Sequence, residues 1–277
     1  MQQDHAKTRQ VNFHVTRYNP ASDRAPYVKT YAIPVQSGMT VLDGLHYIKD
    51  NVDPTLAWRY SCRMGVCGSC GMLLNGKPTL ACNTQILHIA KTDLTVAPLP
   101  NFEIIRDLVP DLMSMFDKHV SVKPFIVRAD EAEINDPAGE FCQSPEELEA
   151  YLQFTYCIKC GCCMAACPTL ATDARYLGPM PLAAAQRYNA DTRDGGRRQR
   201  NEATGGGHGA FRCHYAGECS RVCPKGVDPA KAIQHMKRRL VLDYLRLSRR
   251  QEPCRKLHGP GEGKPLPGIA APPARTV

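Results

Sequence analysis

The chain has 277 residues, a formal net charge of +8 and fourteen cysteines. This length predicts two modest domains, each with a core of its own. The N-terminal residues lack the apolar core of a signal peptide, so we expect a reducing compartment and exclude a secreted disulfide framework. The longest apolar stretches fall short of the ~18 residues of a membrane span, so we expect a soluble protein facing the cytoplasm.

The first third of the sequence predicts a small sheet covered by a helix. Apolar and polar residues alternate over residues 9–18, and residues 28–35 predict the returning strand. Residues 41–50 carry apolar side chains at helical spacing. After a cysteine-rich loop, residues 72–78 predict a hairpin with Asn75 and Gly76 at its tip. This order is typical of a plant-type ferredoxin domain.

Four cysteines surround the predicted hairpin in a Cys-x4-Cys-x2-Cys pattern with a fourth member downstream. They are Cys62, Cys67, Cys70 and Cys82. This is the plant-type ferredoxin spacing, so we predict a 2Fe–2S cluster. The loop glycines permit tight turns, and backbone N–H groups and the hydroxyls of Ser61 and Ser69 can donate to sulfur. A zinc site is the alternative, although zinc patterns usually pair two Cys-x2-Cys motifs.

Beyond residue 105 the pattern predicts helices. Asp107 is expected to cap the first of them, and a polar stretch over residues 128–143 leads onward. Ser144 and Glu147 form a predicted capping box at the start of a helix that ends at a cysteine run. Asp228 begins another helix directly after the second run. The second domain is therefore expected to be helical.

Two further cysteine runs occupy residues 157–167 and 213–223. The first, Cys-x2-Cys-x2-Cys-x3-Cys-Pro, has the bacterial ferredoxin spacing, in which the fourth cysteine binds the other cluster. We therefore predict that the two runs exchange ligands. The predicted 4Fe–4S ligands are Cys157, Cys160, Cys163 and Cys223.

The reciprocal site takes Cys167, Cys213 and Cys219. A full ferredoxin motif would place another cysteine at position 216, where this chain has Ala216. Because alanine cannot bind iron, we predict a 3Fe–4S cluster. The alternative is a 4Fe–4S cluster completed by solvent or by another residue.

Other features carry weaker predictions. The remaining cysteines are Cys142, Cys162 and Cys254. Cys162 is expected to be a small buried apolar residue, and the other two to be incidental thiols. Basic residues gather over residues 193–200 and 237–250, which predicts solvated faces or contact with anionic lipid. No nucleic-acid-binding motif accompanies them.

The predicted fold class is α+β. Residues 1–105 form a β-grasp domain of the plant-type 2Fe–2S ferredoxin kind, and residues 106–248 form an all-helical domain of the bacterial ferredoxin kind with the 4Fe–4S and 3Fe–4S clusters. Residues 249–277, rich in Pro and Gly, are expected to form a tail without a fold of its own.

Over roughly residues 9–245 the chain resembles the iron–sulfur subunit of succinate dehydrogenase and fumarate reductase. The three cluster motifs occur in the order found in that family. The motifs that carry the resemblance are Arg17–Pro20, Leu42–Asn51, Ser61–Met64, Cys67–Gly71, Tyr176–Pro179, Arg187–Asn189 and Cys223–Pro229.

The resemblance implies a subunit of a membrane-bound succinate:quinone oxidoreductase, in the tricarboxylic acid cycle or in anaerobic respiration. The implied partners are a flavoprotein subunit with covalent FAD, where substrate chemistry takes place, and a membrane cytochrome b anchor with quinone and haem b. Single electrons would pass in the order FAD, 2Fe–2S, 4Fe–4S, 3Fe–4S and quinone. The implied location is peripheral, on the cytoplasmic face of a prokaryotic inner membrane.

The resemblance also suggests quinone-binding residues. His214 matches a position near the quinone in the dehydrogenase branch, whereas Gln234 and Lys237 match quinol-contacting positions in the fumarate reductase branch. The alternative is that they are ordinary exposed polar residues. Ala171 and Thr172 stand where the dehydrogenase branch has paired tryptophans, which favours the fumarate reductase or menaquinone-linked branch.

Two other classes of function are considered. A soluble assembly, such as a thiol:fumarate reductase or a glycolate oxidase, would use a related iron–sulfur subunit, but such subunits often carry paired Cys-Cys-Gly motifs that this sequence lacks. A non-enzymatic redox sensor or nucleic-acid-binding cluster protein would not need a 2Fe–2S domain together with a missing cysteine at position 216.

Overall fold

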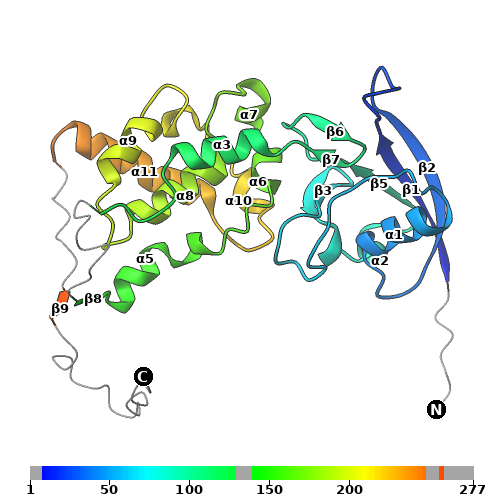
Figure 1. Ribbon diagram of the computed structural model, residues 1–277, viewed down its shortest axis with the longest axis horizontal. Coiled ribbons are helices and arrows are strands. Elements are labelled where there is room, and N and C mark those ends of the chain that lie inside the picture. Colours follow the sequence, from blue (N-terminus) through cyan, green and yellow to red (C-terminus); the bar gives the residue numbers. More distant parts are fainter. Residues whose placement is uncertain (1–7, 129–138, 248–255, 259–277) are drawn as a thin grey trace, which may run out of the picture.

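The computed structural model describes residues 8–128, 139–247 and 256–258. Along the chain, a half that contains a sheet is followed by a helical half (Figure 1). The strands of the sheet are β1 (Arg9–Arg17), β2 (Tyr27–Val35), β3 (Gly71–Leu74), β4 (Lys77–Leu80) and β5 (Asp93–Ala97). They lie in the order β2-β1-β5-β3-β4.

The alternation predicted for the first strand is confirmed. Val11, Phe13 and Val15 are fully buried and lie on one face of β1, which pairs antiparallel with β2. Strand β5 was not predicted; it runs parallel to β1 and joins it to the β3–β4 hairpin. The hairpin turns at Asn75 and Gly76, both with left-handed backbone, as the sequence predicted.

Helix α1 (Val41–Asn51) supplies much of the core of this half. It begins at a capping box in which Thr40 accepts from the Asp43 N–H and Asp43 accepts from the Thr40 N–H. A Cβ atom at Gly44 would lie 2.6 Å from Cζ of Phe13, so the helix approaches β1 this closely only because position 44 is glycine. Two short helices follow the hairpin, η1 (Ala81–Asn83) and α2 (Ile86–Ile89).

The prediction that Asp107 caps a helix is wrong. Asp107 lies between β6 (Ile104–Arg106) and β7 (Val109–Pro110), and the helix α3 begins later, over Met113–Ser121. The buried Asp107 carboxylate accepts a 2.9 Å hydrogen bond from Nε of Arg17, whose Nη1 donates to Asp53 at 2.7 Å. A buried guanidinium needs carboxylate partners, and this requirement prevails over the local capping preference.

After α3, the described residues of the second half form helices, as predicted, apart from the strand pair β8–β9 (Gly139–Phe141 and Lys256–His258). The helices are α5 (Pro145–Thr155), α6 (Cys162–Ala165), α7 (Pro168–Thr172), α8 (Pro179–Asn189), α9 (Arg197–Thr204), η2 (Ala210–Arg212), α10 (Glu218–Arg221) and α11 (Pro229–Tyr244). The predicted Ser144–Glu147 capping box and the Asp228 cap are both present. Helix α8 packs against both α5 and α11.

The strand pair joins two distant segments. Strand β8 (Gly139–Phe141) pairs antiparallel with β9 (Lys256–His258), so a short part of the predicted tail takes part in a sheet. The rest of residues 249–277, with Cys254, lies outside the described residues. None of the described helices is long and apolar enough to cross a membrane.

Candidate functional site

The first cysteine group lies beside the β3–β4 hairpin. Cys62 and Cys67 belong to the loop before β3, Cys70 directly precedes that strand, and Cys82 lies in η1 after β4. The Ala81 N–H donates to the Cys70 carbonyl at 3.1 Å, which closes the base of the hairpin. The hairpin thereby returns the fourth cysteine to the loop that carries the other three.

Backbone N–H groups of this loop point at sulfur. Those of Val66 and Cys67 each lie 3.3 Å from Sγ of Cys62, and that of Gly65 lies 3.3 Å from Sγ of Cys82. Hydrogen bonds from the backbone, that of Cys67 first, lower the pKa of Cys62 to about 6. The loop therefore stabilises a thiolate, which is the form that binds iron.

A second group of cysteines, drawn from both C-terminal runs, surrounds a space in the helical half. Its members are Cys157, Cys160, Cys163 and Cys223. They line about 400 Å³ that no protein atom occupies, part of it open to solvent. The left-handed backbone of Lys159 and Gly161 turns the loop between α5 and α6 around this space. This is the set predicted for the 4Fe–4S cluster.

A third group surrounds a neighbouring space of about 320 Å³. Cys167, Cys213 and Cys219 line it, and Ala216 lines the same space. This is the set predicted for the 3Fe–4S cluster, with the alanine in place of a fourth cysteine. The fold thus brings each crossed set together, while the binding of iron by these residues stays a prediction.

The three groups follow one another through the molecule. The loop of the first group touches the second, because a Cβ atom at Gly68 would lie 2.9 Å from Cα of Cys160 and one at Gly71 would lie 2.9 Å from its carbonyl oxygen. Helix α6 connects the second and third spaces, with Cys163 on the helix and Cys167 just beyond its end. In Figure 1, α6 and α10 lie where the helical half meets the sheet.

The chemistry of these spaces fits iron–sulfur clusters. Soft thiolates favour iron–sulfide cores, and in a 4Fe–4S or 3Fe–4S core each cysteine binds a different iron, so the ligands surround a space. Among the described residues, no three His, Cys, Asp or Glu side chains lie close enough to hold a single metal ion. The eleven cysteines of the three groups are free thiols.

The residues suggested for quinone binding lie near the third group. Lys237, on α11, donates from Nζ to the carbonyl of Cys213 at 2.7 Å, and His214 is the next residue in the chain and is exposed. Gln234 lies one turn before Lys237 on α11, and its buried Nε2 has no hydrogen-bond partner within the described chain. Ile233, beside Gln234, lines the third space itself.

Two residues that the sequence did not single out individually also contact the site. The Asn101 side chain donates from Nδ2 to the carbonyls of Met164, Ala165 and Cys167, at 2.9, 3.1 and 3.1 Å. These hydrogen bonds hold the end of α6 against the segment after β5. The second residue, Tyr176, lines the third space and is fully buried. It belongs to a motif quoted above for the resemblance, which was the only sequence signal for it.

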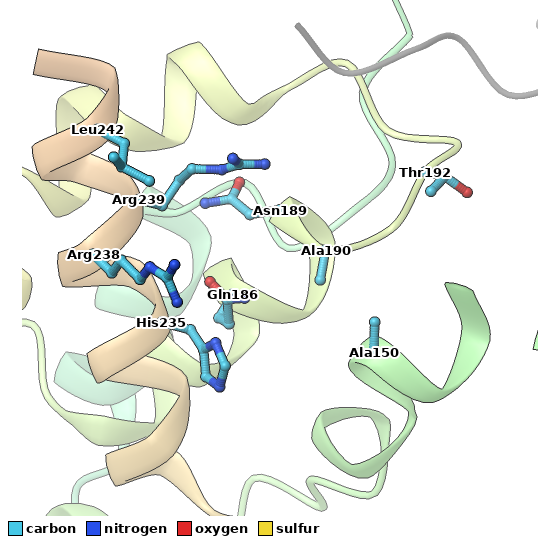
Figure 2. Close-up of a pocket in the computed structure, with 9 residues that line it drawn as sticks. All are labelled: Ala150, Gln186, Asn189, Ala190, Thr192, His235, Arg238, Arg239 and Leu242. Carbon is cyan, nitrogen blue, oxygen red and sulfur yellow. The ribbon is translucent and has the colours of Figure 1, made fainter. Parts of the chain in front are cut away.

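The second basic run contributes to a cleft on the opposite side of α11 from Lys237. Its lining includes His235, Arg238 and Arg239 of α11, facing Gln186 and Asn189 of α8 (Figure 2). The cleft encloses about 970 Å³ outside protein atoms, part of it open to solvent. Burial, then the positive charge of Arg197, lower the pKa of Arg239. For this run, a solvated face and contact with anionic lipid both stay predictions.

The first basic run is not simply a solvated face. Arg200 is fully buried and its Nη1 lies 2.6 Å from Oδ2 of Asp194. Arg193 pairs with the buried Asp191 at 2.9 Å. Each of these two arginines thus neutralises a buried carboxylate. Arg198, which lies between them in the sequence, is exposed.

Two family models match the chain. A "2Fe-2S iron-sulfur cluster binding domain" matches residues 12–117, and a "4Fe-4S dicluster domain" matches residues 153–227. Each match contains the cysteines predicted for the corresponding clusters.

Known proteins are similar over most of their length. The fumarate reductase iron-sulfur subunit of Mycobacterium tuberculosis is 48% identical over 223 residues, which are 80% of this chain and 90% of that protein. The same subunit of Haemophilus influenzae is 43% identical over 85% of this chain and 94% of its own. The mitochondrial succinate dehydrogenase [ubiquinone] iron-sulfur subunit of Dictyostelium discoideum is 41% identical over 82% of this chain and 81% of its own.

A solved structure has the same fold. A chain of the Mycobacterium smegmatis Sdh1 complex in the apo form superposes with a TM-score of 0.72 at 26% identity. The superposition covers 86% of this chain and 97% of that one. The likeness therefore extends across both halves of the molecule.

Proposed function

The chain belongs to the family of iron–sulfur subunits of succinate dehydrogenase and fumarate reductase, and on that premise we propose that it relays single electrons between a flavoprotein subunit and membrane quinone. Clusters bound at the three cysteine groups would supply one-electron chemistry. Substrate chemistry would take place on the partner flavoprotein, so the residues of this chain hold and tune the clusters.

The observation that carries the proposal is the arrangement of the three cysteine groups in a row, each of which adjoins the next. The 2Fe–2S ligands would be Cys62, Cys67, Cys70 and Cys82. The 4Fe–4S ligands would be Cys157, Cys160, Cys163 and Cys223, and the 3Fe–4S ligands Cys167, Cys213 and Cys219. Backbone contact between the loops of the first and second groups, and the short helix shared by the second and third, support passage of electrons along this order.

The two ends of the row suit two different partners. At the first end, Cys67 is exposed and the neighbouring Met64 and Val66 expose apolar side chains, Met64 to 73%. Such an apolar surface around a thiol supports docking of the FAD-containing subunit. At the other end, the exposed Phe211 and Tyr215 flank Cys213, which supports contact with a membrane anchor that carries quinone and haem b.

The exposed Phe211 and Tyr215 also support a peripheral location at a membrane. We place the chain at the cytoplasmic face of a prokaryotic inner membrane, held there through its partners. Quinone would lie beside His214, Gln234 and Lys237, and the residues Ala171 and Thr172 favour menaquinone.

The cluster assignment predicts a specific effect of one cysteine. Replacing Cys223 with serine should remove the 4Fe–4S signal from EPR spectra of the reduced complex, because serine supplies a hard oxygen in place of a soft thiolate. The oxidised 3Fe–4S signal and the 2Fe–2S signal should remain. Cys142→Ser is the matched control, since Cys142 belongs to none of the three groups, and it should leave all three signals and the iron content unchanged.

Two results would contradict the assignment. Loss of the 3Fe–4S signal with retention of the 4Fe–4S signal in Cys223→Ser would mean that the two runs do not exchange ligands. Wild-type complex whose iron content does not match the sum of the three clusters would contradict the cluster types themselves.

Lys237 provides a test of the quinone end. Lys237→Ala should lower quinone turnover several-fold while sparing succinate oxidation with an artificial acceptor, because the acceptor does not need the quinone site. The exposed Lys231, on the same helix, gives the control Lys231→Ala. Equal loss in both assays would instead assign Lys237 a structural role through its bond to the Cys213 carbonyl.

A further inference from the structure

The hydroxyl of Tyr176 is buried without a partner. Its side chain is 0% exposed, and its oxygen forms no hydrogen bond within the described residues. Other buried tyrosines differ, since the Tyr31 hydroxyl donates to Asp53 at 2.8 Å and the Tyr151 hydroxyl donates to Gln143 at 2.7 Å. A buried hydroxyl without a hydrogen-bond partner destabilises the folded protein, so its presence calls for an explanation.

The surroundings of Tyr176 supply one. The residue lines the third space together with Cys167, Cys213 and Cys219, and the thiol of Cys213 lies beside its hydroxyl. Tyr176 also packs in an apolar cluster, and the polar residues Thr169 and Glu218 line the same space. The sulfur of Cys213 is the acceptor within reach of this hydroxyl.

Hydrogen bonds fix the backbone segment that carries the ring. The Tyr176 N–H donates to the Asp173 carbonyl at 3.1 Å, and the next residue, Leu177, donates to the His208 carbonyl at 2.9 Å. The Asp173 carboxylate accepts from Nε of Arg212, the neighbour of Cys213, at 3.0 Å. The same carboxylate thus joins the turn that carries Tyr176 to the segment that carries a cysteine of the third group.

We propose that the Tyr176 hydroxyl donates a hydrogen bond to a sulfur atom of the cluster held by Cys167, Cys213 and Cys219, and that this bond raises the reduction potential of that cluster. The inference rests on the proposed function, because it requires the cluster. The phenol donates and keeps its proton, so reduction adds one electron to the cluster and transfers no atom.

The direction of the effect follows from charge. The reduced cluster is more negative than the oxidised one, so a hydrogen-bond donor at sulfur stabilises the reduced form more strongly. A net contribution of one hydrogen bond corresponds to a change of up to about tenfold in the reduction equilibrium, or ~59 mV for a one-electron couple. Tyr176 would therefore help the last cluster of the row to draw electrons toward quinone.

The test is Tyr176→Phe in the intact complex, with Tyr151→Phe as the control. Both variants remove one hydroxyl from a buried ring in the helical half, but the Tyr151 hydroxyl has protein partners. A redox titration followed by the oxidised 3Fe–4S EPR signal should show a lower midpoint potential for Tyr176→Phe and an unchanged one for Tyr151→Phe. In addition, pulsed EPR of the wild type exchanged into D₂O should reveal a deuteron coupled to the cluster, in place of an exchangeable proton, that is absent from Tyr176→Phe.

The outcomes separate this inference from the function on which it rests. An intact 3Fe–4S signal in Tyr176→Phe, with wild-type potential and the same coupled proton, overturns the role of Tyr176 alone. Absence of an oxidised 3Fe–4S signal from the wild-type complex overturns the cluster assignment and the inference together. An equal shift in both variants also overturns the inference, because it would reflect a general loosening of the helical half.

Discussion

Replacing Ala216 with cysteine should convert the 3Fe–4S cluster into a 4Fe–4S cluster and sharply slow electron transfer to quinone. Ala216 lines the same space as Cys167, Cys213 and Cys219, so a thiol at this position would complete a set of four. A 4Fe–4S cluster with four thiolates is expected to have a lower potential than the 3Fe–4S cluster that it replaces. The measurements are loss of the oxidised EPR signal, gain of one iron and a fall in quinone reduction.

The surroundings of Ala216 allow this substitution without repacking. The residue is exposed, and the left-handed backbone at Tyr215 and Gly217 already forms the turn that presents it. Ala216→Ser is the matched control, because a hydroxyl of nearly the same size is a poor ligand for iron. Retention of three irons and of the oxidised signal in Ala216→Cys would mean that something other than the missing cysteine determines the cluster type.

Replacing Arg200 with methionine should destabilise the helical half by about 3–5 kcal/mol, because it leaves the carboxylate of Asp194 buried without its counter-charge. Arg200 and Asp194 expose 0% and 1% of their side chains. Arg200 also donates to the carbonyls of Lys123 and Phe125, at 3.0 and 2.6 Å. The substitution therefore also removes two hydrogen bonds that hold the segment after α3. Anaerobic urea unfolding followed by circular dichroism should show a lower midpoint.

Arg198→Met provides the comparison, since Arg198 is exposed on the same helix and loses the same charge. Its effect should stay within about 0.5 kcal/mol, as for most surface substitutions. If the two variants unfolded at the same urea concentration, the buried pair would contribute no more than an exposed arginine.

The elements that could be predicted from the sequence are those with local signals. The alternation in β1, the Asn75–Gly76 turn and the caps at Ser144 and Asp228 all depend on residues close together in the chain. Strand β5 was missed because its place, between β1 and β3, depends on pairings with distant residues. Asp107 was misread as a cap for the same reason, because its partner Arg17 lies ninety residues earlier.

The grouping of the cysteines could be predicted because the ferredoxin spacing of a run implies that its fourth cysteine joins the other run, while the binding of iron stays a prediction. Backbone N–H groups and the hydroxyls of Ser61 and Ser69 were both named as possible donors to sulfur, and in the described loop the bonds to Cys62 and Cys82 come from the backbone. The other surroundings of the sulfurs could not be predicted. Likewise, the positions of Asn101 and Tyr176 beside the later groups depend on packing between segments far apart in the chain.

The crossed arrangement of the cysteine runs also has a consequence for how the protein is made. If each set binds its cluster, two inorganic bridges join α6 to α10 and close long loops of chain, much as disulfides do. Cross-links of this kind lower the entropy of the unfolded chain, and metal affinity then becomes folding free energy. The helical half should therefore acquire its full stability only as its clusters are inserted, which makes cofactor assembly a stage of its folding.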